Sequence, residues 1–464
     1  MDIKEGQILI WPLHYIKTKW VHTSLVDAAP TGGASLNGKS NGLRNMLQPG
    51  DGVKLRKEDA CAGIKTTPAH AEPKKSNGSA AQTPGLGNSR PPSCILGMGT
   101  ATPDRVFPMA EFAKTILHGF GENDTPEVRE FSARICKSSG IMKKHMALGR
   151  EIYHGDPNMQ TYGAPSLDKR FNLFAPEAVK IGTLAAERAI SNWGGDKSKI
   201  THLITYSTSG MTSPALDMQL IKVLGLAQTV KHFWVSLMGC HAGLIGIRTA
   251  AEIAQADPAY RVLVVCVEIN SAQAQPLNPA KLLDLNNHVV SIIFGDGAAG
   301  VVIGSQPDEY ETPIFEIHRS HTSYIPDTDY HITAKISQSG LLATLNKNVP
   351  VVVGQNCEKF VAQLLQGTEL ESDTVNWAVH PGGKAVVDAV EKACRLEPEQ
   401  LRWTRYVLEN YANMSSPTIL FVLDKLRNEA QKLPAGSRHL IHPWTVVVGF
   451  GPGMTMEGIL LKNC

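Results

Sequence analysis

A cysteine at the end of an apolar strand is the residue in this sequence most suited to chemistry. The run Phe233–Gly243 reads as a strand that ends in glycine, with Cys240 opening a predicted helix over 241–256. That helix carries two full charges, so we expect it to be buried. The unpaired N–H groups at a helix start favour a thiolate. Cys240 is therefore a candidate nucleophile, and the alternative is an inert buried thiol.

Two further polar residues stand at element ends in the second half of the chain. His380 follows the apolar run Trp377–Val379 and precedes Pro381–Gly383, where glycines let a ligand approach the backbone. Asn413 comes just before Ser415–Pro417, a predicted helix N-cap with proline in the first turn. Taken singly, each has an ordinary interpretation as a core histidine or a turn asparagine.

The elements that must position these residues alternate between helix and strand. Helices are predicted over 175–193, 216–224, 241–256, 351–366, 384–394 and 417–431, and strands over 93–96, 200–205, 233–237, 262–269, 289–293, 298–303, 375–379, 406–408, 445–448 and 458–461. This alternation predicts an α/β protein with layered, mainly parallel or mixed sheets. The similar rhythm of the two halves suggests a duplicated unit.

The N-terminal segment differs from the rest. Residues 1–91 are rich in Gly, Pro, Ser, Asn and Lys without a sustained period, which predicts a disordered extension. It has no secretory signal, so we expect a cytoplasmic protein, although its composition leaves a plastid transit peptide open. The expected domains are 1–91, a half at 92–310 that carries the cysteine, and a half at 311–464 that carries the histidine and asparagine.

The composition narrows the class of partner. The 464 residues include 45 basic and 43 acidic side chains, so no global field attracts nucleic acid or a membrane surface. No apolar run approaches the ~18 residues of a membrane span. Eight scattered cysteines without CxxC or zinc spacing suit a reducing compartment and predict no metal site.

Together the motifs resemble the type III polyketide synthases, the chalcone and stilbene synthase family of the thiolase-like superfamily. The matching pieces are Gly239-Cys240, Phe294–Ala299, His380–Gly383, Asn413–Ser416 and Gly449–Gly453, and the resemblance covers about 93–462. It implies a five-layer αβαβα thiolase-like fold of two duplicated halves in a homodimer. It also implies an acyltransferase that extends an acyl-CoA starter with malonyl-CoA, using no cofactor besides these CoA thioesters.

The resemblance assigns roles to the three polar residues. Cys240 would hold the growing chain as a thioester, and His380 would pair with it and keep it deprotonated. His380 and Asn413 would both donate hydrogen bonds to the malonyl thioester oxygen, where negative charge develops as CO₂ leaves. The extended chain would finally cyclise to a pyrone, resorcinol or phloroglucinol-type product.

Further positions follow from the same resemblance. Phe294 would be a gatekeeper, Gly382, Gly383 and Ala385 would line the pantetheine path, and Thr208, Ser209, Asn270 and Ser415 would face the cavity. Arg134, with Lys137 nearby, would contact the CoA phosphates. Phe131 and Ser138 replace the family's other basic residues there, which leaves Lys143 and Lys144 as substitutes.

One departure from the plant enzymes bears on the substrate. Ala343 stands where they carry a second gatekeeper phenylalanine, so we expect a wider passage and a long or bulky acyl starter. The segment Gly239–Gly243 also looks more like microbial or algal members than land-plant ones.

Two other functions compete with this interpretation. A ketoacyl synthase of fatty-acid initiation would share the three polar residues but would need malonyl on an acyl-carrier protein. A non-catalytic relative would bind ligands without reaction, and its Cys240 would be no more reactive than the other thiols.

Overall fold

The computed structural model describes residues 91–112, 125–164, 166–432 and 442–464. The chain separates into two units, Met1–Ser79 and Ala80–Cys464, and every described residue belongs to the second. The predicted disordered extension, 1–91, thus lies outside the described residues except for Pro91. In the part of the chain that the structure describes, no helix is long and apolar enough to cross a membrane.

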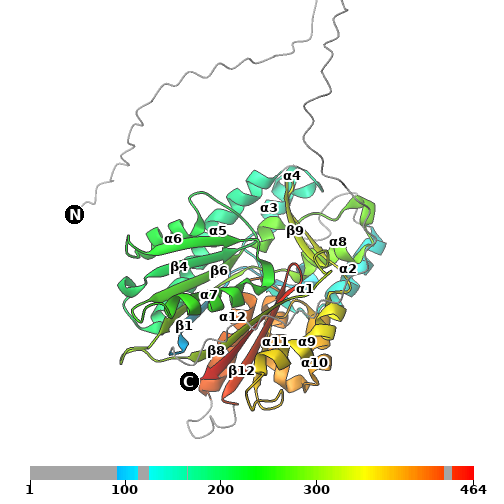
Figure 1. Ribbon diagram of the computed structural model, residues 1–464. Helices are drawn as coiled ribbons and strands as arrows, with labels where there is room; N and C mark the ends of the chain where they lie inside the picture. The colour runs from blue at the N-terminus through cyan, green and yellow to red at the C-terminus, as the bar shows by residue number, and fades with distance from the viewer. Residues whose placement is uncertain (1–90, 113–124, 165, 433–441) are drawn as a thin grey trace, which may run out of the picture. The chain divides into compact units, whose positions relative to one another are not determined.

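Strands and helices alternate through both halves (Figure 1). The strands are β1 (Ser93–Ala101), β2 (Val106–Pro108), β3 (Lys143–His145), β4 (His202–Ser207), β5 (Lys231–Ser236), β6 (Arg261–Glu268), β7 (Gly297–Ser305), β8 (Phe315–Tyr324), β9 (Ile332–Ser337), β10 (Gly340–Leu345), β11 (Asn376–Val379), β12 (Trp444–Gly451) and β13 (Thr455–Asn463). The helices are α1 (Met109–Phe112), α2 (Pro126–Ser138), α3 (Arg150–Gly155), α4 (Pro157–Gln160), α5 (Leu167–Trp193), α6 (Leu216–Leu224), α7 (Ala242–Ala254), α8 (Leu285–Ile293), α9 (Val349–Leu365), α10 (Lys384–Cys394), α11 (Arg402–Tyr411) and α12 (Thr418–Lys432).

The main sheet repeats a four-strand order, β1-β7-β6-β4 in the first half and β8-β13-β12-β11 in the second, and β5 extends the first half. Among the described residues its order is β11-β12-β13-β8-β1-β7-β6-β4-β5. In the first half β4 and β6 are parallel, and β7 runs antiparallel between β6 and β1. In the second half β11 and β12 are parallel, and β13 runs antiparallel between β12 and β8. This repeat confirms the duplicated α/β architecture.

The two halves of the sheet meet along a short seam. Ser93–Ile95 of β1 pair antiparallel with Phe315–Ile317 of β8. Elsewhere β1 belongs to the first half through a long pairing with β7. The seam joins the two sheet halves edge to edge, and one face of each half packs against the same helices, α7 and α12.

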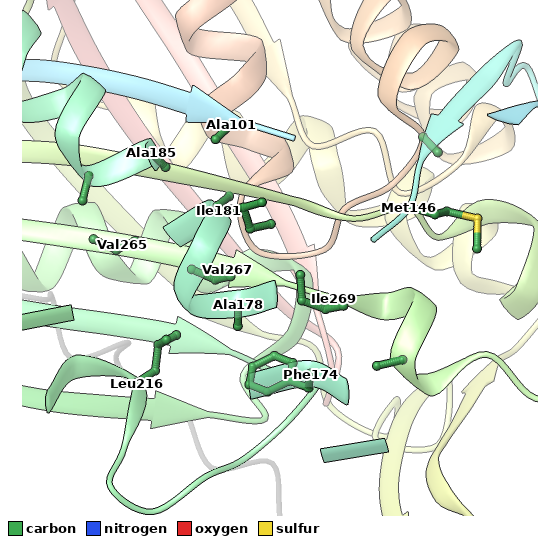
Figure 2. Packing of buried hydrophobic residues seen from close by; sticks show 14 of the residues in the cluster. Ala101, Met146, Phe174, Ala178, Ile181, Ala185, Leu216, Val265, Val267 and Ile269 are labelled. Atoms are coloured by element: carbon green, nitrogen blue, oxygen red, sulfur yellow. The ribbon is translucent and has the colours of Figure 1, made fainter. Parts of the chain in front are cut away.

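The layers follow from the alternation of side chains along each strand. Val265 and Val267 of β6 point to an outer core against α5, where Phe174 and Ile181 pack on them (Figure 2). The intervening Val264 and its neighbours join a central core shared with α7 and α12.

The second half repeats this alternation. Val447 of β12 lies in the central core, whereas Val446 and Val448 lie in a third core against α9 and α10. One helix layer thus covers the outer face of each sheet half, and a third layer lies between the two halves. Figure 1 shows α9 and α10 side by side in the outer layer of the second half.

Two predicted strands are helices in the structure. The apolar run 289–293 lies in α8, which begins upstream at Leu285 after the N-cap Asp284, whose carboxylate accepts a hydrogen bond from the Asn286 N–H. The run 406–408 lies in α11, whose buried Thr404, Val407 and Leu408 follow helical spacing. A run of three to five apolar residues does not by itself separate strand from helix.

Candidate active site

Cys240, His380 and Asn413 line one cavity of about 380 Å³. They come from three separate turns, which follow β5, β11 and α11. Much of the remaining wall is apolar and comes from the hairpin β9–β10 and the start of α9, with Ile332, Ala334, Leu341, Leu342, Leu345 and Val349. A cavity with an apolar wall and a few convergent polar groups is the usual form of a small-molecule site.

A single 3-10 turn, Gly239–His241, presents Cys240 at the start of α7. Gly239 has φ 75, a conformation that side chains disfavour, and a β-carbon there would lie 2.6 Å from Pro452 Cδ. The Gly239 N–H donates to Thr208 Oγ1 at 3.0 Å. The turn is thus fixed between the β4 end and the Gly449–Gly453 loop.

Burial shifts the pKa values of both the cysteine and the histidine toward the neutral side chains. Burial raises the pKa of the Cys240 thiol to about 11, against hydrogen bonds from Ser415 and Asn413 that lower it. Burial, and then the charge of His241, lowers the pKa of His380 to about 3. Loss of hydration outweighs the modest help of a helix start. Neither ring nitrogen of His380 has a hydrogen-bond partner among the described residues.

The Asn413 side chain is held in one orientation. Its Oδ1 accepts a hydrogen bond from the Ser415 N–H at 2.7 Å. This assigns Nδ2 to the opposite side, where it lies 3.2 Å from the Gly382 carbonyl oxygen and 3.8 Å from Cys240 Sγ. The backbone around it is strained, since Ala412 and Ser415 have φ of 63 and 61. An amide N–H donor is therefore fixed beside the thiol.

The backbone of Asn413 is also tied to the first half of the fold. Its N–H donates to the Ile293 carbonyl at 2.9 Å, and its own carbonyl accepts from the Gly295 N–H at 3.0 Å. These bonds form an isolated parallel bridge between Phe294 and Asn413. The candidate gatekeeper and the amide are thus neighbours on one scaffold.

The structure divides the other predicted site residues into three groups. Phe294, Ala343, Thr208, Asn270, Ser415 and Gly382 line the cavity. Gly383 and Ala385 lie beside it, at the start of α10 and outside its described wall. Arg134 and Lys137 are exposed on α2, away from the cavity lining.

Two expectations for individual residues are wrong. Ser209 is buried behind the cavity wall, where its Oγ accepts a hydrogen bond from the Ile269 N–H at 2.8 Å. Lys144 is 1% exposed, so it cannot serve as a surface contact for CoA phosphates. Its neighbour Lys143 is exposed on the same strand, because successive side chains of a strand point to opposite faces.

Sequence reasoning missed two residues near the thiol. Glu268 is fully buried at the end of β6, and its carboxylate accepts from the Thr208 and Ser209 N–H groups and from the Ser416 hydroxyl. Its signal was a charge closing an otherwise apolar strand. His241, next to Cys240, is buried against Gly451. Its only signal in the sequence was its position at the start of an apolar helix.

The comparison with protein families decides the class. The chain matches the model for the N-terminal domain of chalcone and stilbene synthases over residues 83–307. It matches the model for their C-terminal domain over residues 316–464. The chain belongs to the chalcone and stilbene synthase family. It therefore has the thiolase-like α/β fold and is an acyltransferase of the type III polyketide synthase class.

Within the described residues of this chalcone and stilbene synthase family member, no group of three or more His, Cys, Asp or Glu side chains is placed to hold a metal ion. All the described cysteines are free thiols. The polar groups that line the cavity include the thiol, the imidazole, the Asn413 amide, several hydroxyl and amide side chains, and the charged residues Lys144, Lys281 and Asp284.

Proposed function

We propose that this polyketide synthase loads an acyl-CoA starter onto Cys240 and extends it with malonyl-CoA, using His380 and Asn413. One observation carries the proposal: the thiol, an imidazole whose nitrogens have no partner in the described part of the chain, and an oriented amide N–H share one cavity. The thiol supplies the nucleophile, and the other two supply proton transfer and hydrogen-bond donation.

Loading begins with a neutral pair. As the Cys240 sulfur attacks the starter thioester, a His380 ring nitrogen accepts the thiol proton, because burial keeps the imidazole unprotonated and the proton moves while the sulfur–carbon bond forms. The carbon–sulfur bond to CoA breaks, and the proton passes to the departing CoA thiolate. The starter remains as a thioester on Cys240.

Extension uses the two donors. The malonyl thioester oxygen accepts hydrogen bonds from Asn413 Nδ2 and from a His380 ring N–H. When the carbon–carbon bond to CO₂ breaks, its electron pair forms an enolate whose charge lies on that oxygen. Each oriented donor in such a site is worth on the order of 3 kcal/mol. The enolate carbon attacks the acyl-Cys240 carbonyl and the bond to sulfur breaks, so the chain, longer by two carbons, leaves as a CoA thioester and the Cys240 thiolate takes a proton from water.

The starter is a long or bulky acyl group. The support is the apolar part of the cavity wall, where Ala343 of β10 and Val349 of α9 present small side chains among larger apolar ones. The product is a pyrone, resorcinol or phloroglucinol-type ring. The CoA phosphates lie near Arg134, Lys137 and Lys143, since α2 packs against α8, which contributes to the cavity wall.

The enzyme acts as a homodimer formed through β5. This strand is the last in the sheet order, and its Phe233 is 40% exposed. Leu237 and Met211 beside it are also exposed. An edge strand with exposed apolar side chains is a template for pairing with a second copy.

The direct test is incubation of the chain with a panel of acyl-CoA starters and labelled malonyl-CoA, with products read by mass. We expect multiply extended products from long-chain starters without any carrier protein. A requirement for malonyl-carrier protein, with release after one condensation, would assign the ketoacyl synthase reaction instead. Failure of Cys240→Ser to abolish product would remove the thiol from the mechanism.

A further inference from the structure

Lys144 of β3 is a buried lysine next to the segment that carries Phe294, and burial lowers its pKa to about 7. Its side chain lines the cavity although it is 1% exposed. Its ammonium group lies 3.3 Å from the centroid of the Phe112 ring. A lysine is almost never buried to this degree unless its charge is paired or hydrogen-bonded, so its contacts should explain its place.

Those contacts are carbonyl groups at the end of α8. The Lys144 Nζ donates to the carbonyl oxygens of Ser291 at 2.8 Å, Phe294 at 3.0 Å and Ile292 at 3.4 Å. The last carbonyls of a helix have no partner within it and carry its negative dipole end. An ammonium has three N–H donors, so these three acceptors use all of them.

The segment that Lys144 holds also holds Asn413. The Ile293 carbonyl and the Gly295 N–H, which lie within and just beyond the clamped residues, make the two backbone hydrogen bonds of Asn413. Asp296, the next residue, is buried and accepts from the Ala147 N–H at 2.7 Å and from the Ser271 N–H at 2.8 Å. Gly295 and Asp296 thus have other partners, since the Gly295 carbonyl accepts from Asn270 Nδ2 at 2.6 Å, whereas Lys144 contacts the carbonyls of residues 291, 292 and 294.

We infer that Lys144 is a positioning residue that fixes segment 291–295 and, through it, both the Phe294 ring and the Asn413 amide at the cavity. The roles of Phe294 and Asn413 in this inference rest on the proposed function. Lys144 itself does not touch the reacting atoms. Its loss should weaken the donor that acts on malonyl and leave the thiol able to accept a starter.

The test compares Lys144→Met, which keeps the length and apolar stem, with Lys359→Met, which removes an exposed lysine on α9. Two partial reactions are measured separately: transfer of a labelled acyl group from acyl-CoA to Cys240, and release of CO₂ from malonyl-CoA. We expect kcat for CO₂ release to fall by about 10- to 100-fold in Lys144→Met with KM within about threefold, since a misplaced group costs this much. Acyl transfer should stay within about threefold, and Lys359→Met should match the wild-type chain.

Hydrogen–deuterium exchange gives a readout that does not depend on activity. The Gly295 and Asn413 amides should exchange faster in Lys144→Met than in the wild-type chain and in Lys359→Met. If Lys144→Met does not fold, Phe112→Leu keeps the amine and removes the ring, and it should lower CO₂ release about three- to tenfold. Lys144→Arg, which keeps charge and donors, should restore most of the protection.

The outcomes separate this inference from the proposed function. Equal losses in both partial reactions, or unchanged exchange at Gly295 and Asn413, would overturn the positioning role. A wild-type chain that neither accepts an acyl group nor releases CO₂ would refute the proposed function, and the exchange measurement would still decide what Lys144 holds.

Discussion

The imidazole of His241 lies directly against the backbone of Gly451, so that a β-carbon at 451 would overlap its Nδ1. His241 follows the candidate nucleophile, and Gly451 ends β12 two residues after Gly449, which packs near His380. The glycine-rich loop therefore has a steric reason for its composition beyond turn formation. It makes room for a ring that lies behind the site.

Gly451→Ala should displace His241 and disturb the turn that holds Cys240. Overpacking of a rigid interior typically costs about 1–3 kcal/mol, and we expect that loss in urea unfolding together with a clear fall in acyl transfer to Cys240. Gly155→Ala is the matched control, because nothing lies within 4 Å of a β-carbon there. Equal behaviour of the two variants would show that His241 moves aside at no cost.

The reactivity of Cys240 should follow its raised pKa. With a pKa of about 11, the thiolate fraction at pH 7 is on the order of 10⁻⁴. Alkylation by iodoacetamide should therefore rise about tenfold per pH unit from pH 7 to pH 10, because the thiolate is the reactive form. Mass spectrometry of the labelled peptide measures the rate. A plateau beginning near pH 6 would instead indicate a preformed thiolate–imidazolium pair.

Asn413→Ala should separate loading from extension. Removing the Nδ2 donor should lower CO₂ release from malonyl-CoA by about 10²- to 10³-fold, the usual effect of losing one oxyanion donor. Acyl transfer to Cys240 should change far less, because the thiol and His380 remain. Asn356→Ala on α9 is a control asparagine outside the cavity lining. Equal loss of both steps would contradict the assigned role.

Ala343→Phe should narrow the range of starters. The ring would fill the space beside Leu341 and Leu345 of β10, so that kcat/KM for long acyl-CoA starters falls on the order of tenfold or more. Acetyl-CoA, which does not reach that wall, serves as the internal control. A uniform loss for every starter would point to a disturbed fold instead of a shaped cavity.

Phe233→Glu should separate the proposed dimer into monomers. It places a charge on the exposed face of the edge strand β5, where partial burial against a second copy would cost hydration. Size-exclusion chromatography with light scattering measures the mass. Val351→Glu, an equally drastic change at an exposed position of α9, should leave the mass unchanged, and a monomeric wild-type chain would refute the dimer.

The sequence was enough to predict the elements with long periodic patterns. It was also enough to predict that the three polar motifs meet in one place. Helix α10 has the bounds predicted for it, and Cys240, His380 and Asn413 line one cavity as their positions at element ends suggested. Short apolar runs gave wrong predictions of strands, because α8 and α11 are helical owing to a cap and to buried residues that lie outside these runs.

Charge states and burial were harder to predict. Two adjacent lysines look alike in the sequence, yet strand β3 exposes Lys143 and buries Lys144. The ionisation of Cys240 likewise depended on how completely water is removed, which only the packed structure gives. Tertiary context therefore decided the details that local pattern left open.

The narrow seam between β1 and β8 has a mechanical consequence. Three paired residues on each strand join the two halves of the sheet, and the sulfur comes from the half that contains β5 whereas the imidazole and the amide come from turns after β11 and α11 of the other half. The alignment of the three polar groups therefore depends on the position of one duplicated half relative to the other. A substrate that contacts all three groups is bound to both halves at once. Occupancy of the cavity should therefore raise the force needed to separate the two halves.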